Sequence, residues 1–133
     1  MKKIKVKLKK HSYNIIIESG FMDRAGEYIT RILSSGSVVI ISDETVTKLY
    51  AKRLLENLNK NNITTEMITV PDGENSKSLK TLKDIYSTLI KRKVKRDSSI
   101  FALGGGVVGD LAGFAAATYL RGIPYIQIPT TLL

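Results

Sequence analysis

Residues 98–120 carry the sequence SSIFALGGGVVGDLAGFAAATYL. A short apolar run at 100–103 leads into three consecutive glycines and then into an alanine-rich segment, an order typical of a strand, a tight turn and a helix. The glycines at 104–106 can adopt positive φ angles and leave the backbone bare, while the first turn of the helix presents unpaired N–H groups. The stretch therefore predicts a binding site for a phosphate group.

The chain has 133 residues, 43% of them hydrophobic, which predicts one domain spanning residues 1–133 with a core of its own. It contains no cysteine and a single histidine, His11, which excludes disulfides, thiolate metal sites and histidine clusters. This composition is typical of a soluble protein in the reducing cytoplasm.

The net charge of +9 raises the alternative of a basic module that binds nucleic acid. Six of the lysines lie within residues 1–10, however, and most other basic residues fall on the polar faces of predicted helices. No aromatic residues are interleaved with them and no nucleic-acid motif is present. Solvated basic faces are the favoured interpretation, and we expect neither a nucleic-acid nor a membrane partner.

Strands alternate with helices along the chain, which predicts an α/β fold with a Rossmann-like parallel sheet flanked by helices. The run SVVIIS at 37–42 is apolar throughout, as in a strand buried on both faces. The expected elements are an N-terminal β-hairpin (4–8 and 13–17), helix 21–33, strand 37–42, helix 45–59, strand 64–70, a helix capped by Ser76 or Ser78, strand 98–103, a helix to about 119, and strand 124–128.

Two of these helices are expected to bury an apolar stripe. The stripe of helix 45–59 contains Val46, Leu49, Tyr50, Leu54 and Leu58, and that of the helix after Ser78 contains Leu79, Leu82, Ile85, Tyr86, Leu89 and Ile90.

The loops that follow parallel strands share the carboxyl edge of the sheet, which is where ligands bind. This edge gathers Asp43 and Glu44, residues 71–77, residues 104–110, and Thr130 with Thr131. Carboxylates, bare backbone, one lysine and two hydroxyls suit a dinucleotide better than a metal ion.

Gly104, Gly106 and Gly109 match the spacing G-x-G-x-x-G of dinucleotide-binding turns. The usual acidic residue that holds the ribose about 20 positions downstream is missing, because no Asp or Glu follows Asp110. Asp43, at the end of strand 37–42, is the best candidate for that role.

Other interpretations of the same stretch remain. Gly105, Gly109 and Gly113 also match a small-xxx-small pattern of membrane helices, which the charge of Asp110 disfavours. A nucleotide-triphosphate loop lacks its Gly-Lys-Ser/Thr. Asp110 is either a ligand contact or an acid stabilised by the helix dipole, and Lys77 and Glu74 are individually explained as solvated loop residues.

Three segments together resemble the N-terminal nucleotide-binding domain of the 3-dehydroquinate synthase family. They are PDGENSKSL at 71–79, ALGGGVVGDLAGFAAATYLRG at 102–122 and IQIPTTLL at 126–133. The resemblance implies an NAD-dependent lyase of the shikimate route to aromatic amino acids. Such an enzyme converts the phosphorylated keto acid 3-deoxy-D-arabino-heptulosonate 7-phosphate to 3-dehydroquinate with release of phosphate. It also implies a divalent metal, zinc or cobalt, and a homodimer.

The resemblance further implies which residues bind NAD. Asp43 matches the acid that holds the adenosine ribose, and Arg121 resembles an arginine that meets the substrate phosphate, across a dimer. The remaining matches are Asp72, Gly73, Glu74, Asn75, Ser76 and Lys77 on the ribose and nicotinamide side, Gly105, Gly106, Val107, Val108, Gly109 and Asp110 in the pyrophosphate turn, and Thr130 and Thr131.

The family's metal ligands and most of its substrate contacts have no match within residues 1–133. We therefore expect a fragment that lacks the C-terminal helical metal-binding domain, holds no metal or catalytic residue and does not turn over substrate. Within enzymes, the alternatives are a sister cyclase of the 2-deoxy-scyllo-inosose synthase type and an iron-dependent alcohol or glycerol dehydrogenase. The sequence GVVGDL followed by YLRG favours a cyclase.

Overall fold

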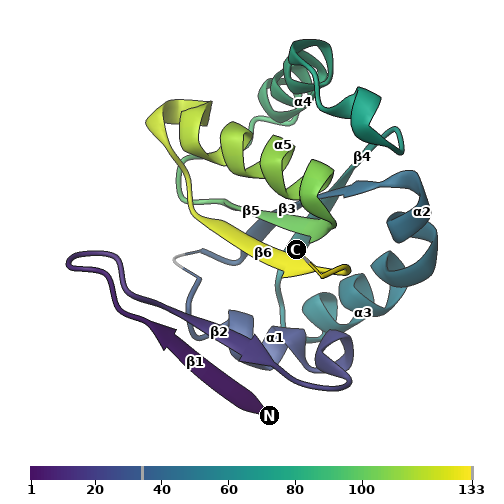
Figure 1. The fold of residues 1–133 in the computed structure, drawn as a ribbon. Coiled ribbons are helices and arrows are strands. Elements are labelled where there is room, and N and C mark those ends of the chain that lie inside the picture. Colours follow the sequence, from purple (N-terminus) through teal and green to yellow (C-terminus); the bar gives the residue numbers. More distant parts are fainter. Residues whose placement is uncertain (34, 133) are drawn as a thin grey trace.

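The computed structural model describes residues 1–33 and 35–132. Its centre is a parallel sheet of four strands in the order β4-β3-β5-β6, and a separate antiparallel hairpin is formed by β1 and β2 (Figure 1). The chain therefore has the expected α/β fold with an N-terminal hairpin. The strands are β1 (Lys2–Val6), β2 (Tyr13–Ile17), β3 (Ser37–Asp43), β4 (Thr64–Val70), β5 (Ser99–Gly104) and β6 (Tyr125–Pro129).

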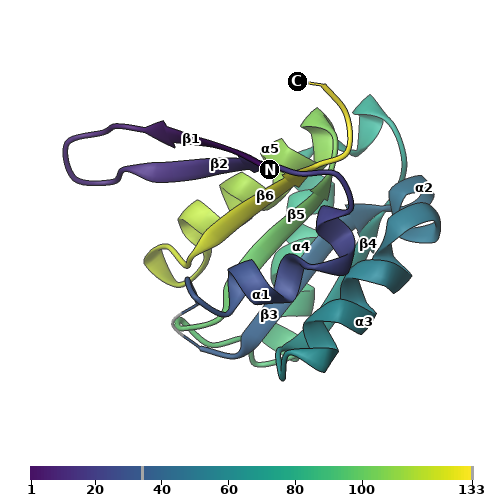
Figure 2. The ribbon, with the colours of Figure 1, turned by 90° about the horizontal axis from the view of Figure 1, so that it is seen from below.

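Helices cover both faces of this sheet. α4 and α5 lie on one face, and α1 and α3 lie on the other (Figures 1 and 2). The helical segments are η1 (Phe21–Asp23), α1 (Ala25–Ile29), α2 (Glu44–Val46), η2 (Thr47–Ala51), α3 (Lys52–Lys60), η3 (Glu74–Ser76), α4 (Leu79–Lys91), α5 (Gly106–Thr118) and η4 (Tyr119–Arg121).

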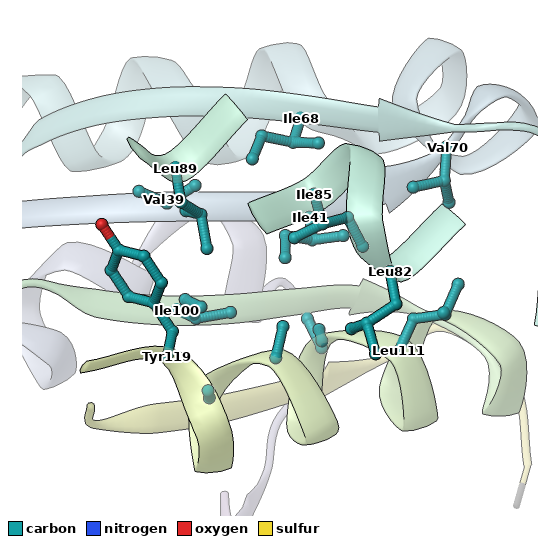
Figure 3. Packing of buried hydrophobic residues seen from close by; sticks show 14 of the residues in the cluster. Val39, Ile41, Ile68, Val70, Leu82, Ile85, Leu89, Ile100, Leu111 and Tyr119 are labelled. Carbon is teal, nitrogen blue, oxygen red and sulfur yellow. The ribbon is translucent and has the colours of Figure 1, made fainter. Parts of the chain in front are cut away.

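The strand side chains alternate between two hydrophobic cores. Val39 and Ile41 of β3 face α4 and α5, whereas Val38 and Ile40 face α1 and α3, and all four are buried. This alternation follows from the two-residue period of a strand, and it requires apolar residues at every position. Burial of each such side chain stabilises the fold by roughly 1.5–3 kcal/mol. Figure 3 shows the first core, in which α4 and α5 side chains meet those of β3, β4 and β5.

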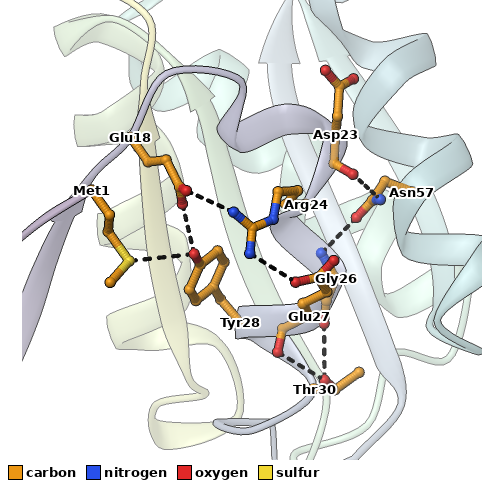
Figure 4. A network of polar contacts seen from close by, with 9 residues as sticks. All are labelled: Met1, Glu18, Asp23, Arg24, Gly26, Glu27, Tyr28, Thr30 and Asn57. Atoms are coloured by element: carbon orange, nitrogen blue, oxygen red, sulfur yellow. Dashed lines mark hydrogen bonds and ion pairs between the residues drawn. The ribbon is translucent and has the colours of Figure 1, made fainter.

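The single helix expected at 21–33 is wrong, because the structure divides it into η1 and α1 and ends α1 at Ile29. The break is at Arg24, whose φ of −128° is not helical. Asn57 of α3 occupies the break, since its side-chain oxygen accepts the Gly26 amide at 2.7 Å and its NH₂ group donates to the Asp23 carbonyl (Figure 4). A contact 31 residues away in sequence thus replaces part of the helical hydrogen bonding.

The hairpin is tied to α1 through Glu18, which follows β2 directly. Its carboxylate accepts hydrogen bonds from Arg24 at 2.8 Å and from the Tyr28 hydroxyl at 2.6 Å (Figure 4). The bond to Glu18 is the main cause of a raised pKa at Tyr28. A two-stranded hairpin is marginally stable alone, so this network holds it against the domain.

The helix expected at 45–59 is longer and contains a π turn. It begins at Glu44, passes through η2 and continues to Lys60. Leu49 is 62% exposed and does not belong to its buried stripe. In α4, likewise, Leu79 and Ile90 are 83% and 66% exposed, so the buried stripe is shorter at both ends than the sequence predicts. The α4 cap is Ser78, which accepts the Thr81 amide.

The glycines of α5 lie against strand β6 and the residues after it. A Cβ atom at Gly105 would lie 3.0 Å from Thr131 Oγ1, one at Gly109 would lie 2.8 Å from Gln127 Nε2, and one at Gly113 would lie 3.6 Å from Tyr125. The small-xxx-small pattern therefore serves close packing of a helix on a strand. Residues 99–104 are a strand and α5 has 13 residues. Across the described residues, we find no helix with the length and apolar character of a membrane span.

Gly104 and Gly113 test which glycines are required by close packing around α5. A Cβ atom at Gly104 would lie 2.9 Å from Val108, a β-branched core residue, so Gly104→Ala is expected to destabilise the fold by about 1–3 kcal/mol. At Gly113 the nearest contact is an ordinary 3.6 Å, so Gly113→Ala is expected to stabilise it by roughly 0.5–1 kcal/mol through helix propensity. Urea denaturation followed by circular dichroism measures both. Equal effects of the two substitutions would contradict the packing.

Candidate functional site

The candidate site lies where β3 and β5 end side by side. β3 pairs with β5 in parallel, yet β3 leads into α2 on one face of the sheet and β5 leads into α5 on the other. The Ser42 hydroxyl donates to the Leu103 carbonyl at 2.6 Å and links the two strand ends. Chain connections that diverge in this way leave a crevice at the carboxyl edge, where ligands bind in open α/β sheets.

The amino end of α2 is occupied by two carboxylates. Asp43 Oδ1 accepts the Val46 amide at 2.7 Å, and the two oxygens of Asp72 accept the Thr45 amide and hydroxyl at 3.0 and 2.5 Å. The Thr45 hydroxyl, followed by the Thr45 amide, holds the pKa of Asp72 below its usual value of 3.8. Negative charge therefore already fills this helix end, and the remaining oxygen lone pairs are left for hydroxyl groups.

The amino end of α5 differs. Gly105 is its cap and, within the described part of the chain, no side chain caps this helix. The first helical hydrogen bond runs from the Gly109 amide to the Gly105 carbonyl at 2.9 Å, so the amides of residues 106–108 precede the helical ladder. These amides suit an anion.

The glycines at 104–106 do not use the positive φ angles that glycine can adopt. Gly105 has a φ of −88°, and the described glycines with positive φ are Gly20, Gly73 and Gly122. The glycines of this turn are needed instead for close approach, since Gly104 lies against Val108 and Gly105 against Thr131.

Thr130 and Thr131 lie at the glycine turn, as the sequence predicts. The Thr130 amide donates to the Gly104 carbonyl at 3.1 Å, and the Thr131 side chain faces Gly105. Thr130 Oγ1 is buried and has no hydrogen-bond partner among the described residues. An unmet buried hydroxyl costs about 1–3 kcal/mol, which a bound ligand with an acceptor or donor group would offset.

Residues 72–77 form the loop between β4 and α4. Gly73 has a φ of +92°, a conformation that favours glycine, and Ser76 donates to the Pro71 carbonyl. Glu74 and Asn75 are exposed at the tip. Lys77 reaches across to α5 and forms an ion pair of 2.5 Å with Asp110.

The Lys77–Asp110 pair lies in an open groove of about 890 Å³ between α4, α5 and β6. The hydrogen bond to Asp110 is the main cause of a raised pKa at Lys77. Both side chains are about half exposed, so the pair contributes little to stability. Gly106 and Gly109 also line the groove, which connects the loop 72–77 with the glycine turn.

Three of the candidate residues are placed differently. The Val108 side chain is buried in the core, so Val108 offers a ligand only its backbone, and the partly buried Val107 side chain packs against the same core. Arg121 lies in η4, at the far end of α5, which is roughly 20 Å from the glycine turn for a helix of 13 residues. The structure does not bring Arg121 to the other candidates.

Sequence reasoning missed Thr45 and Tyr125. Thr45 binds Asp72 from the neighbouring loop, and the Tyr125 hydroxyl donates to the Gly109 carbonyl at 3.1 Å. Thr45 stands two residues after a strand-end acid, a position from which a hydroxyl reaches the next loop. No pattern in the sequence pointed to Tyr125.

Stability in acid tests the role of Asp72. Because its pKa is lowered in the folded state, ionised Asp72 stabilises the fold above the usual value of 3.8, and this contribution disappears as the pH falls through the lowered pKa. We expect Asp72→Asn to lower the urea midpoint at pH 6, and the difference from wild type to close below about pH 3.8. Asp84→Asn, at an exposed carboxylate of α4, is the control and should match wild type at each pH. A pH-independent difference for Asp72→Asn would contradict the assignment.

Comparison with known proteins supports the sequence resemblance. The chain is 47% identical over 133 residues to the 3-dehydroquinate synthase of Clostridium acetobutylicum, but it spans only 37% of that protein's length. Two solved structures share the fold. One is 2-deoxy-scyllo-inosose synthase complexed with carbaglucose-6-phosphate, NAD⁺ and Co²⁺ (TM-score 0.86, 26% identity, 98% of this chain and 35% of that chain). The other is ValA, the 2-epi-5-epi-valiolone synthase from Streptomyces hygroscopicus subsp. jinggangensis 5008, with NAD⁺ and Zn²⁺ bound (TM-score 0.78, 29% identity, 95% and 34%).

The family model described as 3-dehydroquinate synthase N-terminal matches residues 67–133, which include the loop 72–77, the glycine turn and strand β6. The chain therefore belongs to the 3-dehydroquinate synthase N-terminal family.

Proposed function

We propose that residues 1–133 form the NAD-binding domain of a 3-dehydroquinate synthase. The observation that carries this proposal is the contrast between two helix ends at one crevice. The amino end of α2 is filled by Asp43 and Asp72, whereas that of α5 begins at a glycine with open amides. A dinucleotide needs both, because its pyrophosphate is an anion and its ribose offers hydroxyls.

The residues of this chain would bind and orient the dinucleotide. The amides of residues 106–108 donate to the pyrophosphate, and Asp43 accepts from the hydroxyls of the adenosine ribose. Asp72, which the resemblance places on the ribose and nicotinamide side, lies next to Asp43 through its bonds to Thr45 and offers a second carboxylate to ribose hydroxyls. Thr130 Oγ1 is buried without a partner among the described residues, and beside the turn it would form a hydrogen bond with the bound dinucleotide. When bound, NAD supplies the hydride acceptor and donor for transient oxidation of a substrate hydroxyl. Lys77 belongs to the loop proposed for the ribose and nicotinamide side, and its ion pair with Asp110 joins this loop to the pyrophosphate turn.

The proposed reaction of the parent enzyme is conversion of 3-deoxy-D-arabino-heptulosonate 7-phosphate to 3-dehydroquinate with release of phosphate. Identity of 47% to a 3-dehydroquinate synthase favours this substrate over those of the sister cyclases, whose structures are 26–29% identical. The bound NAD⁺ and Co²⁺ or Zn²⁺ of those two structures support NAD and a divalent metal in the parent enzyme. The described residues contain no cluster of three potential metal ligands, and we assign no step to a metal here.

The proposal includes a homodimeric parent enzyme in the cytoplasm that binds neither nucleic acid nor membrane. Arg121, remote from the other candidates of its own chain, would then meet the substrate phosphate bound by the other protomer. Its φ of +67° is a left-handed conformation, which costs energy for a non-glycine residue and fits a position with a function.

Nucleotide binding is tested with Gly106→Val. A side chain at the start of α5 would stand where the pyrophosphate meets the first amides, so we expect NAD affinity to fall at least about tenfold. Ligand-observed NMR with the 133-residue chain measures the binding. Gly113→Ala, on the same helix but away from its amino end, is the control and should bind as wild type. If Gly106→Val folds and binds NAD equally well, α5 does not hold the pyrophosphate.

Turnover is tested by release of inorganic phosphate from 3-deoxy-D-arabino-heptulosonate 7-phosphate with NAD and zinc. We expect none from the 133-residue chain, because the resemblance places the metal and most substrate contacts outside it. Formation of dehydroquinate by this chain would overturn its assignment as a cofactor domain only. A full-length relative, the 3-dehydroquinate synthase of Clostridium acetobutylicum, serves as the positive control.

A further inference from the structure

The β1–β2 hairpin carries an apolar face that no other segment of the described chain covers. The register aligns Ile4 with Ile15, and directly opposite residues of an antiparallel pair lie on the same face. The next pair on this face is Val6 with Tyr13. Neither hydrophobic core includes a residue of β1 or β2. The large apolar side chains of the hairpin that are between 40% and 55% exposed are Ile4, Leu8, Tyr13, Ile15 and Ile17.

This concentration of exposed apolar side chains calls for a partner surface. Single exposed apolar residues are common on proteins, but a contiguous patch of a few hundred Å² marks an interaction site. A two-stranded hairpin is also marginally stable until something packs against it. The bonds of Glu18 to Arg24 and Tyr28 fix the base of the hairpin and leave its apolar face open.

The position of the hairpin favours a separate partner over a later segment of the proposed parent chain. The loop 7–12 projects past the end of the sheet at which β5 and β6 begin (Figures 1 and 2). β6 ends at the opposite, carboxyl edge, and in the proposed parent enzyme the chain would continue from there. The hairpin therefore extends away from the point where a following segment would start.

The lysines of the hairpin do not oppose contact between two copies of this face. The net charge of +9 and the six lysines within residues 1–10 would repel a second copy at close range. Strand alternation, however, directs Lys3 and Lys5 to the opposite face, which Asn14 shares. Two sheets stack about 10 Å apart, so lysines on the two outer faces would be separated by more than the Debye length of about 8 Å. Lys2 lies on the apolar face, at its margin.

The area of the face also meets what a second copy requires. With about half of their surface free, the five exposed side chains offer about 500 Å² per copy and about 1,000 Å² per pair, which is close to the lower limit for a specific interface. A two-fold axis lets the same face serve on both sides of such a contact, and this is the commonest arrangement of homo-oligomers.

We infer that the apolar face of the β1–β2 hairpin is a dimerisation surface, on which the same face of a second copy of this chain packs. The inference rests on the homodimer of the proposed function and names its contact. The two apolar faces form a small sandwich, and Lys3 and Lys5 of both copies remain in solvent. Because the buried area is near the lower limit, we expect a reversible dimer with a dissociation constant of roughly 10–100 µM.

Sedimentation equilibrium of the 133-residue chain from about 1 to 500 µM measures this association. Ile15→Glu, which places a charge at the centre of the apolar face, should weaken the dimer at least about tenfold. Asn14→Glu is the matched control, because it puts the same charge on the same strand but on the other face, opposite Lys5, and it should leave the dimer unchanged. Ile15→Thr keeps a β-branched residue suited to a strand, and it should weaken the dimer about three- to tenfold with the hairpin intact.

Three outcomes would overturn the inference. The first is a wild-type chain that stays monomeric over this range. The second is equal dimerisation of wild type, Ile15→Glu and Ile15→Thr, which would place the contact on another surface. The third is loss of the dimer in Asn14→Glu as well, which would show that the contact is not confined to the apolar face.

NAD binding, followed by ligand-observed NMR, reports on the proposed function separately. All three variants should bind NAD as wild type does, which also shows that they are folded. A monomer that binds NAD would count against the hairpin contact alone. A dimer that does not bind NAD would count against the cofactor-binding function alone.

Discussion

The parallel pairing of β3 with β5 is the interaction on which the rest of the structure depends. The register runs from Val38 beside Ser99 to Ser42 beside Leu103, although about 60 residues separate the two strands in sequence. The intervening segment forms β4 on the outer side of β3, so the chain must return across β3 to add β5. Because of this reversal, the helices after β3 and β5 start at one crevice and leave it on opposite faces of the sheet. The loop after β4 and the residues after β6 lie at the same edge on either side of this crevice.

Two helix amino ends meet at that crevice, each with the positive end of its dipole. Carboxylates bond the amino end of α2, whereas that of α5 begins at a glycine. Asp43 is the last residue of β3 and also the cap of α2, so the end of the strand places its carboxylate at the amino end of the helix. Asp72 comes from the loop after β4, next to β3, and its two hydrogen bonds to Thr45 fix both loops together. At α5 the turn between strand and helix contains no side chain that competes for the amides. In the proposed complex, this difference in local charge would direct ribose hydroxyls to α2 and phosphates to α5.

Much of the fold follows from the sequence, because its signals are local. β3 and β5 are apolar at nearly every position, the hairpin alternates in β1, and turn residues separate the elements, so all six strands are found at nearly the predicted positions. The break at Arg24 was not predictable, since it depends on Asn57 of another helix. The exposure of Leu79 also escaped prediction, because periodicity gives the direction of a side chain and not where the covering layer ends.

The candidate site was predictable at the level of loops and less so at the level of atoms. Topology placed Asp43, Asp72 and Gly106 at one edge, while the partnership of Thr45 with Asp72 and the ion pair of Lys77 with Asp110 required coordinates. The largest difference between the sequence analysis and the structure concerns what the glycines of the turn are needed for.

Glycine can adopt positive φ angles, yet the glycines near the start of α5 serve close packing instead, most clearly at Gly109, where a Cβ atom would lie 2.8 Å from Gln127 Nε2 of β6. That contact fixes α5 to the strand that carries Thr130, and the Tyr125 hydroxyl reinforces it at the Gly109 carbonyl. Missing Cβ atoms thus bring the first amides of α5 close to the last strand, as the proposed NAD site requires. A side chain at Gly105 or Gly109 that lifted α5 from β6 would separate them, so packing and the proposed binding place the same demand on these two positions.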